Sequence, residues 1–129
     1  MIAGDMVASV GTILVAPGDG DMRLYLASVA RLAALNARVA SPAHGPPIDA
    51  PTLLFERYIE HRRMREERVY SALPPPSEPA VTSSPLVPRG YDDTSSYLWP
   101  LARLSVEAHL AKLVEDGRAR ESEGRFAKC

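Results

Sequence analysis

The sequence predicts an α+β fold followed by a smaller, mainly helical unit. A continuous apolar run over residues 12–16 is typical of a strand buried on both faces. Apolar residues three and four positions apart, over residues 22–36 and again over 51–72, are typical of helices with one buried face. Six of the twelve prolines lie between Pro74 and Pro88, which indicates a linker. We therefore expect a first domain at 1–73, a linker at 74–90 and a second unit at 91–129.

Length and composition restrict the possible functions. A chain of 129 residues can bury only a thin core. Its formal net charge of −1 gives no reason to expect a surface for nucleic acid or for an anionic membrane. The sequence has neither a run of about eighteen apolar residues nor the start of a signal peptide, so we expect no membrane partner. The single cysteine, Cys129, excludes an intramolecular disulfide and suits a reducing cytoplasm.

The elements of the first domain follow from its turn and capping residues. After the predicted strand at 12–16, Pro17-Gly18 begins a turn, and Asp19 or Asp21 can cap the helix over 22–36. Residues 38–41 are a short strand, and the proline-rich stretch 42–47 is a loop. Asp49 is a candidate cap for the long helix that ends near Ala72.

The second unit has the outline of a winged helix. A short helix is expected around residues 97–104, interrupted at Pro100, and a second helix should run from Ser105 to Glu115. A turn at 122–124 between residues 118–121 and 125–128 predicts a β-hairpin. Two helices and a hairpin form a unit of about forty residues, which is small for independent folding.

Five motifs occur in a fixed order along nearly the whole chain. They are Gly4-Asp5, Gly20-Asp21 followed by Tyr25, Leu26 and Ser28, Pro42-Ala43-His44-Gly45-Pro46, His61-Arg62 with Arg65-Glu66, and Val106 with His109-Leu110 and Lys112-Leu113. In this order they resemble the branch of the metallo-β-lactamase superfamily typified by β-lactamase-like protein 2, with Ala43 in place of the usual glycine. The resemblance implies the second half of an αββα sandwich followed by a winged-helix domain.

The resemblance also implies a metal site. Asp5 and His44 match the positions of a carboxylate that bridges two metal ions and of a histidine that binds one of them, and in such families the metals are two zinc ions. A strand-end carboxylate and a loop histidine without a metal are the alternative. Since two ligands do not complete a zinc site, we assign no catalytic residue to the chain alone.

The superfamily's main metal motif, His-x-His-x-Asp-His, does not occur, and the three histidines are His44, His61 and His109. We therefore expect the C-terminal fragment of a zinc-dependent hydrolase that is inactive alone; whether it is an enzyme stays open. The intact family would cleave an ester, a thioester or an RNA phosphodiester. The expected partner is the missing N-terminal half or a second copy, because half a sandwich exposes an apolar sheet face.

Two further residues are candidates for contacting the substrate. His61 and Arg62 lie on the long helix, and Arg62 would face an anionic substrate in the intact enzyme. The structural alternatives are favoured: a packed or hydrogen-bonded His61, and an ion pair between Arg62 and Glu66, which are four residues apart.

A non-catalytic winged-helix module that binds a protein partner or nucleic acid is the alternative function. Arg103, His109 and Lys112 could then face phosphates, but five acidic residues nearby disfavour this, because phosphate binding needs clustered positive charge. These acidic residues are Glu107, Glu115, Asp116, Glu121 and Glu123.

Overall fold

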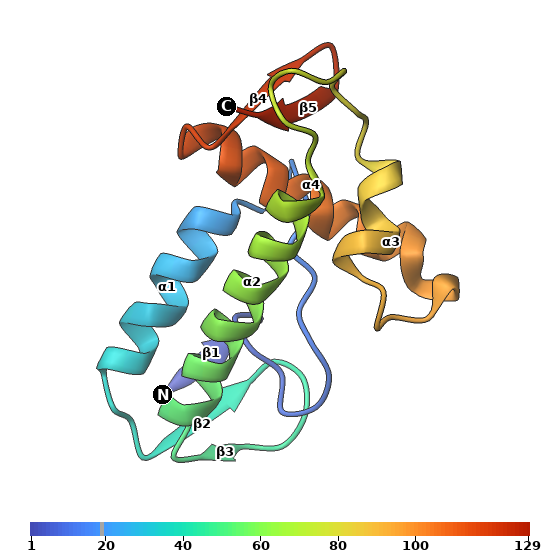
Figure 1. Ribbon diagram of the computed structural model, residues 1–129. Coiled ribbons are helices and arrows are strands. Elements are labelled where there is room, and N and C mark those ends of the chain that lie inside the picture. Colours follow the sequence, from blue (N-terminus) through green and yellow to red (C-terminus); the bar gives the residue numbers. More distant parts are fainter. Residues whose placement is uncertain (19) are drawn as a thin grey trace. The chain divides into compact units, whose positions relative to one another are not determined.

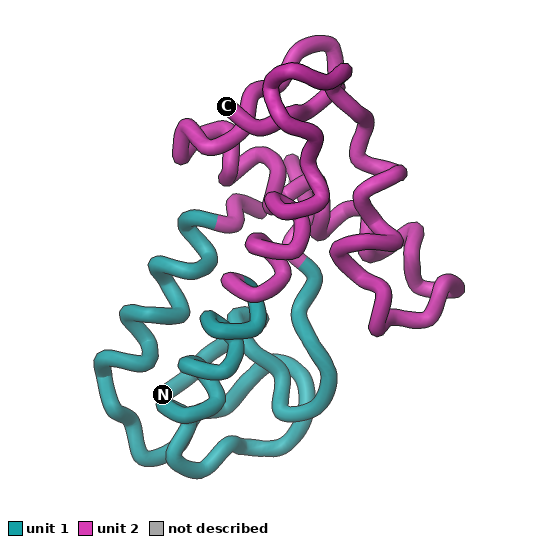
Figure 2. Tube along the Cα trace, viewed as in Figure 1, with its two compact units in different colours: residues 1–14, 23–62 teal, residues 15–22, 63–129 magenta. Residues whose placement is uncertain are grey.

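The computed structural model describes residues 1–18 and 20–129 and divides the chain into two compact units (Figures 1 and 2). Unit 1 comprises residues 1–14 and 23–62, and unit 2 comprises residues 15–22 and 63–129. The boundary falls inside one continuous helix, α2 (Thr52–Ala72), which supplies residues to both units. The expected capping role of Asp19 lies outside the described residues. The domain limits at residues 73 and 91 stay predictions.

Unit 1 contains a three-stranded mixed sheet in the order β1-β2-β3. β1 (Ile2–Gly4) pairs in parallel with β2 (Val39–Pro42), and β2 pairs antiparallel with β3 (Ile48–Asp49). Parallel neighbours require a crossover, and the connection between β1 and β2 includes α1 (Met22–Ala34). The buried apolar side chains of this unit include those of Ala3, Val7, Ala8, Tyr25, Val29, Ala40, Pro51 and Phe55.

The strand predicted at residues 12–16 is wrong. The backbone there is irregular, Leu14 is 47% exposed, and Val15 is buried. The carbonyl of Ile13 accepts a hydrogen bond from the guanidinium of Arg62 instead of one from a neighbouring strand. An apolar run alone does not define a strand, because the strand also needs a partner for its backbone groups.

The helices of unit 1 begin and end close to their expected limits. Asn36 has a φ of 46°, the left-handed conformation that often follows a helix C-terminus, and α1 ends just before it. Pro51 precedes the first residue of α2, where a missing N–H costs nothing. Asp49 lies in β3, so its expected capping position is wrong. The hydroxyl of Thr52 instead contacts the side-chain oxygen of Asn36 at 3.3 Å.

The residues expected to form a linker contribute to the core of unit 2. They include a 3₁₀ helix, η1 (Ser84–Leu86), and α3 (Val87–Gly90). Leu86 and Val87 are 2% and 3% exposed, so this stretch is packed rather than freely solvated. The core that they join is made of Val69, Ala72, Leu73, Leu86, Val87, Tyr91, Ala102, Val106, Leu110, Leu113 and Ala119.

One helix replaces the two expected after residue 96. After η2 (Ser96–Leu98), α4 runs without interruption from Trp99 to Glu115. Pro100 lies in its first turn, where proline is well tolerated, and Ser105 is a buried residue of its interior rather than a cap.

The hairpin is present as expected, with β4 (Ala119–Ser122) antiparallel to β5 (Arg125–Lys128). Glu123 and Gly124 connect the strands with φ angles of 52° and 72°. A two-residue turn with both φ angles positive matches the right-handed twist of the flanking strands. With these elements the α+β prediction is confirmed.

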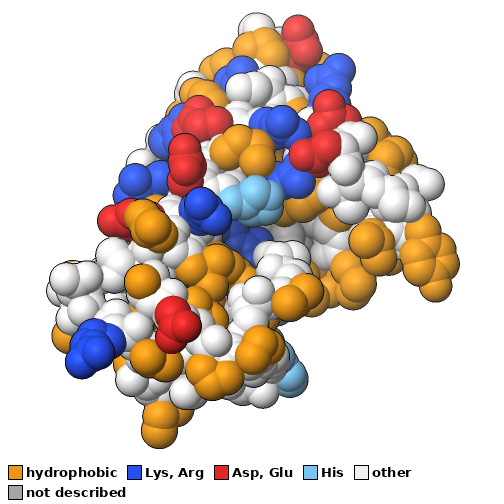
Figure 3. Space-filling model, turned by 90° about the horizontal axis from the view of Figure 1, so that it is seen from below, with side chains coloured by type: hydrophobic (Ala, Val, Ile, Leu, Met, Phe, Trp, Pro, Cys, Tyr) orange, Lys and Arg blue, Asp and Glu red, His pale blue; other side chains and the backbone are white. Residues whose placement is uncertain are grey.

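Several large apolar side chains remain at the surface, as the orange atoms in Figure 3 illustrate. In unit 1, Ile2 is 89% exposed and Val10 is 82% exposed. In unit 2, Tyr97 is 88% exposed. Within the described residues, no helix combines the length and the hydropathy that a membrane crossing requires.

Candidate metal site

The two predicted metal ligands lie next to each other in unit 1. Nε2 of His44 is 3.3 Å from Oδ1 of Asp5, and each side chain is 75% exposed. Asp5 directly follows β1, and His44 follows β2, the parallel neighbour of β1. Because parallel strands end at the same edge of a sheet, residues far apart in the sequence come together here.

The backbone around this pair has little freedom. Gly4, immediately before Asp5, has a φ of 55°. Gly45, immediately after His44, has a φ of 91°, and a Cβ atom there would lie 2.8 Å from the Cβ of Ser9. Only glycine permits both the left-handed backbone and this close approach. The amide of Ser9 donates to the His44 carbonyl at 3.4 Å, and the Ser9 hydroxyl donates to the carbonyl of Pro46.

Two tyrosine hydroxyls hold the irregular segment 6–13 that follows Asp5. The hydroxyl of Tyr25 on α1 donates to the Met6 carbonyl at 3.0 Å. The hydroxyl of Tyr58 on α2 accepts from the amide of Ala8 at 3.3 Å and lies 3.1 Å from the carbonyl of Gly11. Segment 6–13 has no sheet partners, so these side chains satisfy backbone groups that would otherwise lack them.

Arg62 is the third polar side chain that holds this segment. It is 3% exposed, donates to the carbonyl of Ile13, and lies 5.5 Å from the centre of the Tyr25 ring. Burial raises the pKa of the Tyr25 hydroxyl, and the nearby guanidinium opposes that rise. The predicted ion pair between Arg62 and Glu66 is wrong, because Arg62 binds segment 6–13 and Glu66 contacts residues of α4 and Arg118.

His61 is exposed on α2. The structure brings Asp5 and His44 together but does not add His61 to their contact. Within residues 1–18 and 20–129, no group of three or more histidine, cysteine, aspartate or glutamate side chains is arranged to hold a metal ion. The role of His61 or Arg62 in substrate binding stays a prediction.

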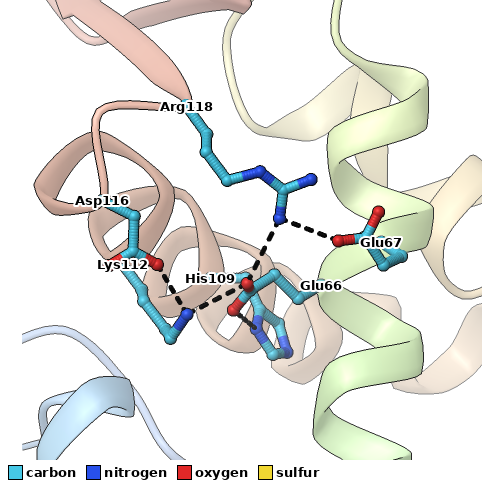
Figure 4. A network of polar contacts seen from close by, with 6 residues as sticks. All are labelled: Glu66, Glu67, His109, Lys112, Asp116 and Arg118. Carbon is cyan, nitrogen blue, oxygen red and sulfur yellow. Dashed lines mark hydrogen bonds and ion pairs between the residues drawn. The ribbon is translucent and has the colours of Figure 1, made fainter.

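A second polar cluster lies inside unit 2, around Glu66 (Figure 4). Lys112 Nζ is 3.0 Å from the Glu66 carboxylate and 2.7 Å from that of Asp116, and His109 Nδ1 is 3.8 Å from Glu66. Arg118 Nη1 reaches Glu67 at 2.8 Å and Glu66 at 3.7 Å. Burial penalises the charged carboxylate of Glu66, but contacts with His109 and Lys112 outweigh it and lower its pKa.

This cluster bears on the alternative of nucleic-acid binding. His109 is fully buried, and Lys112 binds two carboxylates. Arg103, half exposed, pairs with Glu107 at 3.4 Å. The three side chains considered for phosphate contact in the second unit are therefore buried or already paired with carboxylates, which disfavours phosphate binding.

The sequence reasoning missed both tyrosines and the Glu66 cluster. Tyr25 was visible only as part of a motif, and nothing local showed that its hydroxyl would meet a backbone carbonyl. Asp116 caps the C-terminus of α4 and follows Lys112 by four residues, a spacing that does predict contact. Their joint contact with Glu66 depends on tertiary packing.

Comparison with known proteins finds a domain match and similar sequences. Residues 82–127 match the beta-lactamase associated winged helix domain. The chain is 28% identical over 122 residues to a beta-lactamase-like protein 2 homolog of Drosophila melanogaster, covering 95% of this chain and 40% of that protein. It is 31% identical over 117 residues to the Caenorhabditis elegans homolog, covering 91% of this chain and 38% of that protein.

Solved structures with a similar fold cover nearly the whole chain. A crystal structure of a metallo-beta-lactamase family protein from Thermus thermophilus superposes with a TM-score of 0.79 at 24% identity, over 99% of this chain and 41% of that one. The chain thus spans about two fifths of the length of the relatives it matches. This chain is homologous to a C-terminal portion of beta-lactamase-like protein 2, and it carries the beta-lactamase associated winged helix domain.

Proposed function

We propose that this chain supplies Asp5 and His44 to the metal site of a zinc-dependent hydrolase, and that polypeptide outside these 129 residues supplies the other ligands. The observation that carries the proposal is the 3.3 Å distance between the two donor atoms. Two ligands bound to one tetrahedral zinc ion at about 2.0–2.2 Å lie roughly 3.3–3.6 Å apart. The spacing therefore fits shared coordination without rearrangement.

The exposure of the pair supports the same reading. With three quarters of each side chain accessible, both donors can still meet further ligands and a substrate. A carboxylate and a neutral imidazole are ordinary zinc donors, and the carboxylate has a second oxygen that can serve a second ion. The fixed backbone on both sides of the pair keeps the donors together before any metal arrives, which lowers the ordering cost of binding.

A divalent metal bound at this position would supply activation of water at neutral pH and neutralisation of charge on the substrate. The contribution of this chain is positional: segment 6–13, bound by Tyr25, Tyr58 and Arg62, fixes Asp5 and supports the His44 loop through Ser9. The substrate class is an ester, a thioester or an RNA phosphodiester. The names of the relatives, which refer to β-lactamases, support the general hydrolase class only by analogy.

The ligand roles can be mapped with a paramagnetic metal. We expect low concentrations of Mn²⁺ to broaden the amide NMR signals around Asp5 and His44 before those of the rest of the chain. Asp5→Asn and His44→Gln should each abolish this local broadening, because each removes one of two donors. His61→Gln, an exposed histidine of the same unit, is the matched control and should leave it unchanged. If the broadening persisted in both Asp5→Asn and His44→Gln, Asp5 and His44 would not be metal ligands.

A further inference from the structure

A cavity of about 510 Å³ lies entirely within unit 2. Its floor is apolar and includes Ala111 and Val114 of α4 and Phe126 of β5. Cavities of roughly 300–1,000 Å³ with an apolar lining and a few polar groups are typical of sites for small molecules. Neither the metal site nor the proposed hydrolase activity uses this cavity.

The fold explains why these side chains converge. Glu107, Ala111 and Val114 follow one another at intervals of four and three residues, so they share one face of α4. On the hairpin, Glu121 and Phe126 are directly opposite each other in the pairing of β4 with β5, so their side chains lie on the same face. Ala111 is small, and its short side chain leaves room between the helix and the hairpin.

The charged side chains in the described lining are both acidic. Glu107 and Glu121 line the cavity, and among its described lining residues there is no lysine or arginine. The hydroxyl of Ser83 donates to Oε1 of Glu107 at 2.9 Å, and the amide of Gly124 donates to Oε1 of Glu121 at 2.7 Å. Both carboxylates are thus oriented by neutral donors. Arg103 approaches Glu107 at 3.4 Å, but as a half-exposed pair it offsets that charge only weakly.

We propose that this cavity is a binding site for a small organic amine, with an aryl or alkyl group on the floor and its ammonium between Glu107 and Glu121. The apolar floor favours burial of the hydrocarbon part by the hydrophobic effect. The two carboxylates favour a cation over a neutral or anionic group of the same shape. The same negative lining repels phosphates, so nucleic acid does not suit this site.

The test compares two ligands of one shape and opposite charge, 4-phenylbutylammonium and 4-phenylbutanoate, on the full chain. We expect the amine to shift the NMR methyl signals of Ala111 and Val114 and the amide signal of Gly124 in a saturable manner, and the carboxylate to bind several-fold more weakly. Ala111→Phe should abolish amine binding by filling the floor. Since Ala111 is exposed, this variant should still fold.

The carboxylates are tested by substitution. Glu107→Gln and Glu121→Gln should each weaken the amine about threefold to fivefold, the range for one partly exposed ion pair. Glu123→Gln, in the same hairpin but outside the lining, is the matched control and should change nothing. Equal affinity for both ligands, shifts centred elsewhere, or retention of the amine by Ala111→Phe would overturn the proposal.

Discussion

Lys112 and Glu66 form an ion pair of 3.0 Å in the interior of unit 2, with side chains that are 16% and 8% exposed. The pair joins α2 to α4, the two long helices that contribute to that core. His109 and Arg118 also approach the Glu66 carboxylate, so this one acidic group faces three basic side chains. Removing it leaves the largely buried ammonium of Lys112 with one of its two carboxylate partners, which is costly for a charge inside a protein.

Replacement of Glu66 by Gln is therefore expected to lower the free energy of unfolding by about 2–3 kcal/mol at neutral pH. The folded-state pKa of Glu66 lies below its usual value of 4.5, so the stabilisation is present above that value and is lost as the pH falls below it. Urea denaturation at several pH values should show the difference between wild type and variant shrinking in acid. In Glu67→Gln, which removes a largely exposed neighbour, the loss should stay below about 1 kcal/mol.

Tyr58→Phe removes a hydroxyl that contacts two backbone positions of segment 6–13. We expect a loss of about 1–2 kcal/mol, because Ala8 and Gly11 would lose their side-chain partner. Amide hydrogen exchange should accelerate at Ala8 before it does in α2. Tyr97→Phe, which alters an 88% exposed ring, is the matched control. Unchanged protection at Ala8 would show that the hydroxyl does not hold the segment.

Gly45→Ala combines a left-handed backbone with a close contact to Ser9. Gly11→Ala is its control, because Gly11 has a similar φ of 85° but no atom within 4 Å of an added Cβ. Both variants should lose roughly 1 kcal/mol from backbone strain, and Gly45→Ala should lose about 1–2 kcal/mol more from the contact. Thermal unfolding of the two variants checks this. Equal losses of stability in the two variants would mean that the His44 loop accommodates the added methyl group without a further energetic cost.

The exposed apolar side chains of unit 1 predict self-association when no partner covers them. Ile2 and Val39, on neighbouring strands, are 89% and 41% exposed. Size-exclusion chromatography with light scattering should therefore show a mass that rises with concentration, and Ile2→Lys should reduce that rise. A monomer that persists at high concentration would indicate that this face needs no partner.

The sequence predicted correctly those elements that depend on local backbone preferences. It failed for elements that depend on contacts with residues distant in the sequence. The hairpin turn at Glu123-Gly124 and the start of α2 after Pro51 follow from backbone preferences of those residues. The strand at 12–16 and the break at Pro100 were wrong for different reasons. An apolar run forms a strand only where a neighbouring strand pairs with its backbone. Proline breaks a helix only beyond the first turn, and Pro100 lies within it.

The candidate site shows the same division. The proximity of Asp5 and His44 was inferred from resemblance, and the parallel pairing of β1 with β2 gives it a physical cause. The ion pair expected between Arg62 and Glu66 rested on helical spacing alone. In the structure Arg62 binds the carbonyl of Ile13, and Glu66 binds Lys112 and Arg118. Helical spacing does not predict these tertiary partners.

The proposed function requires that Asp5 and His44 are two ligands of a metal site that needs further ligands. Equilibrium dialysis of the purified 129-residue chain against Zn²⁺, with ester, thioester and RNA cleavage assayed on the same sample, tests this directly. We expect weak zinc binding that Asp5→Asn abolishes, and no zinc-dependent turnover by the chain alone. Tight, stoichiometric zinc binding together with turnover would contradict the account.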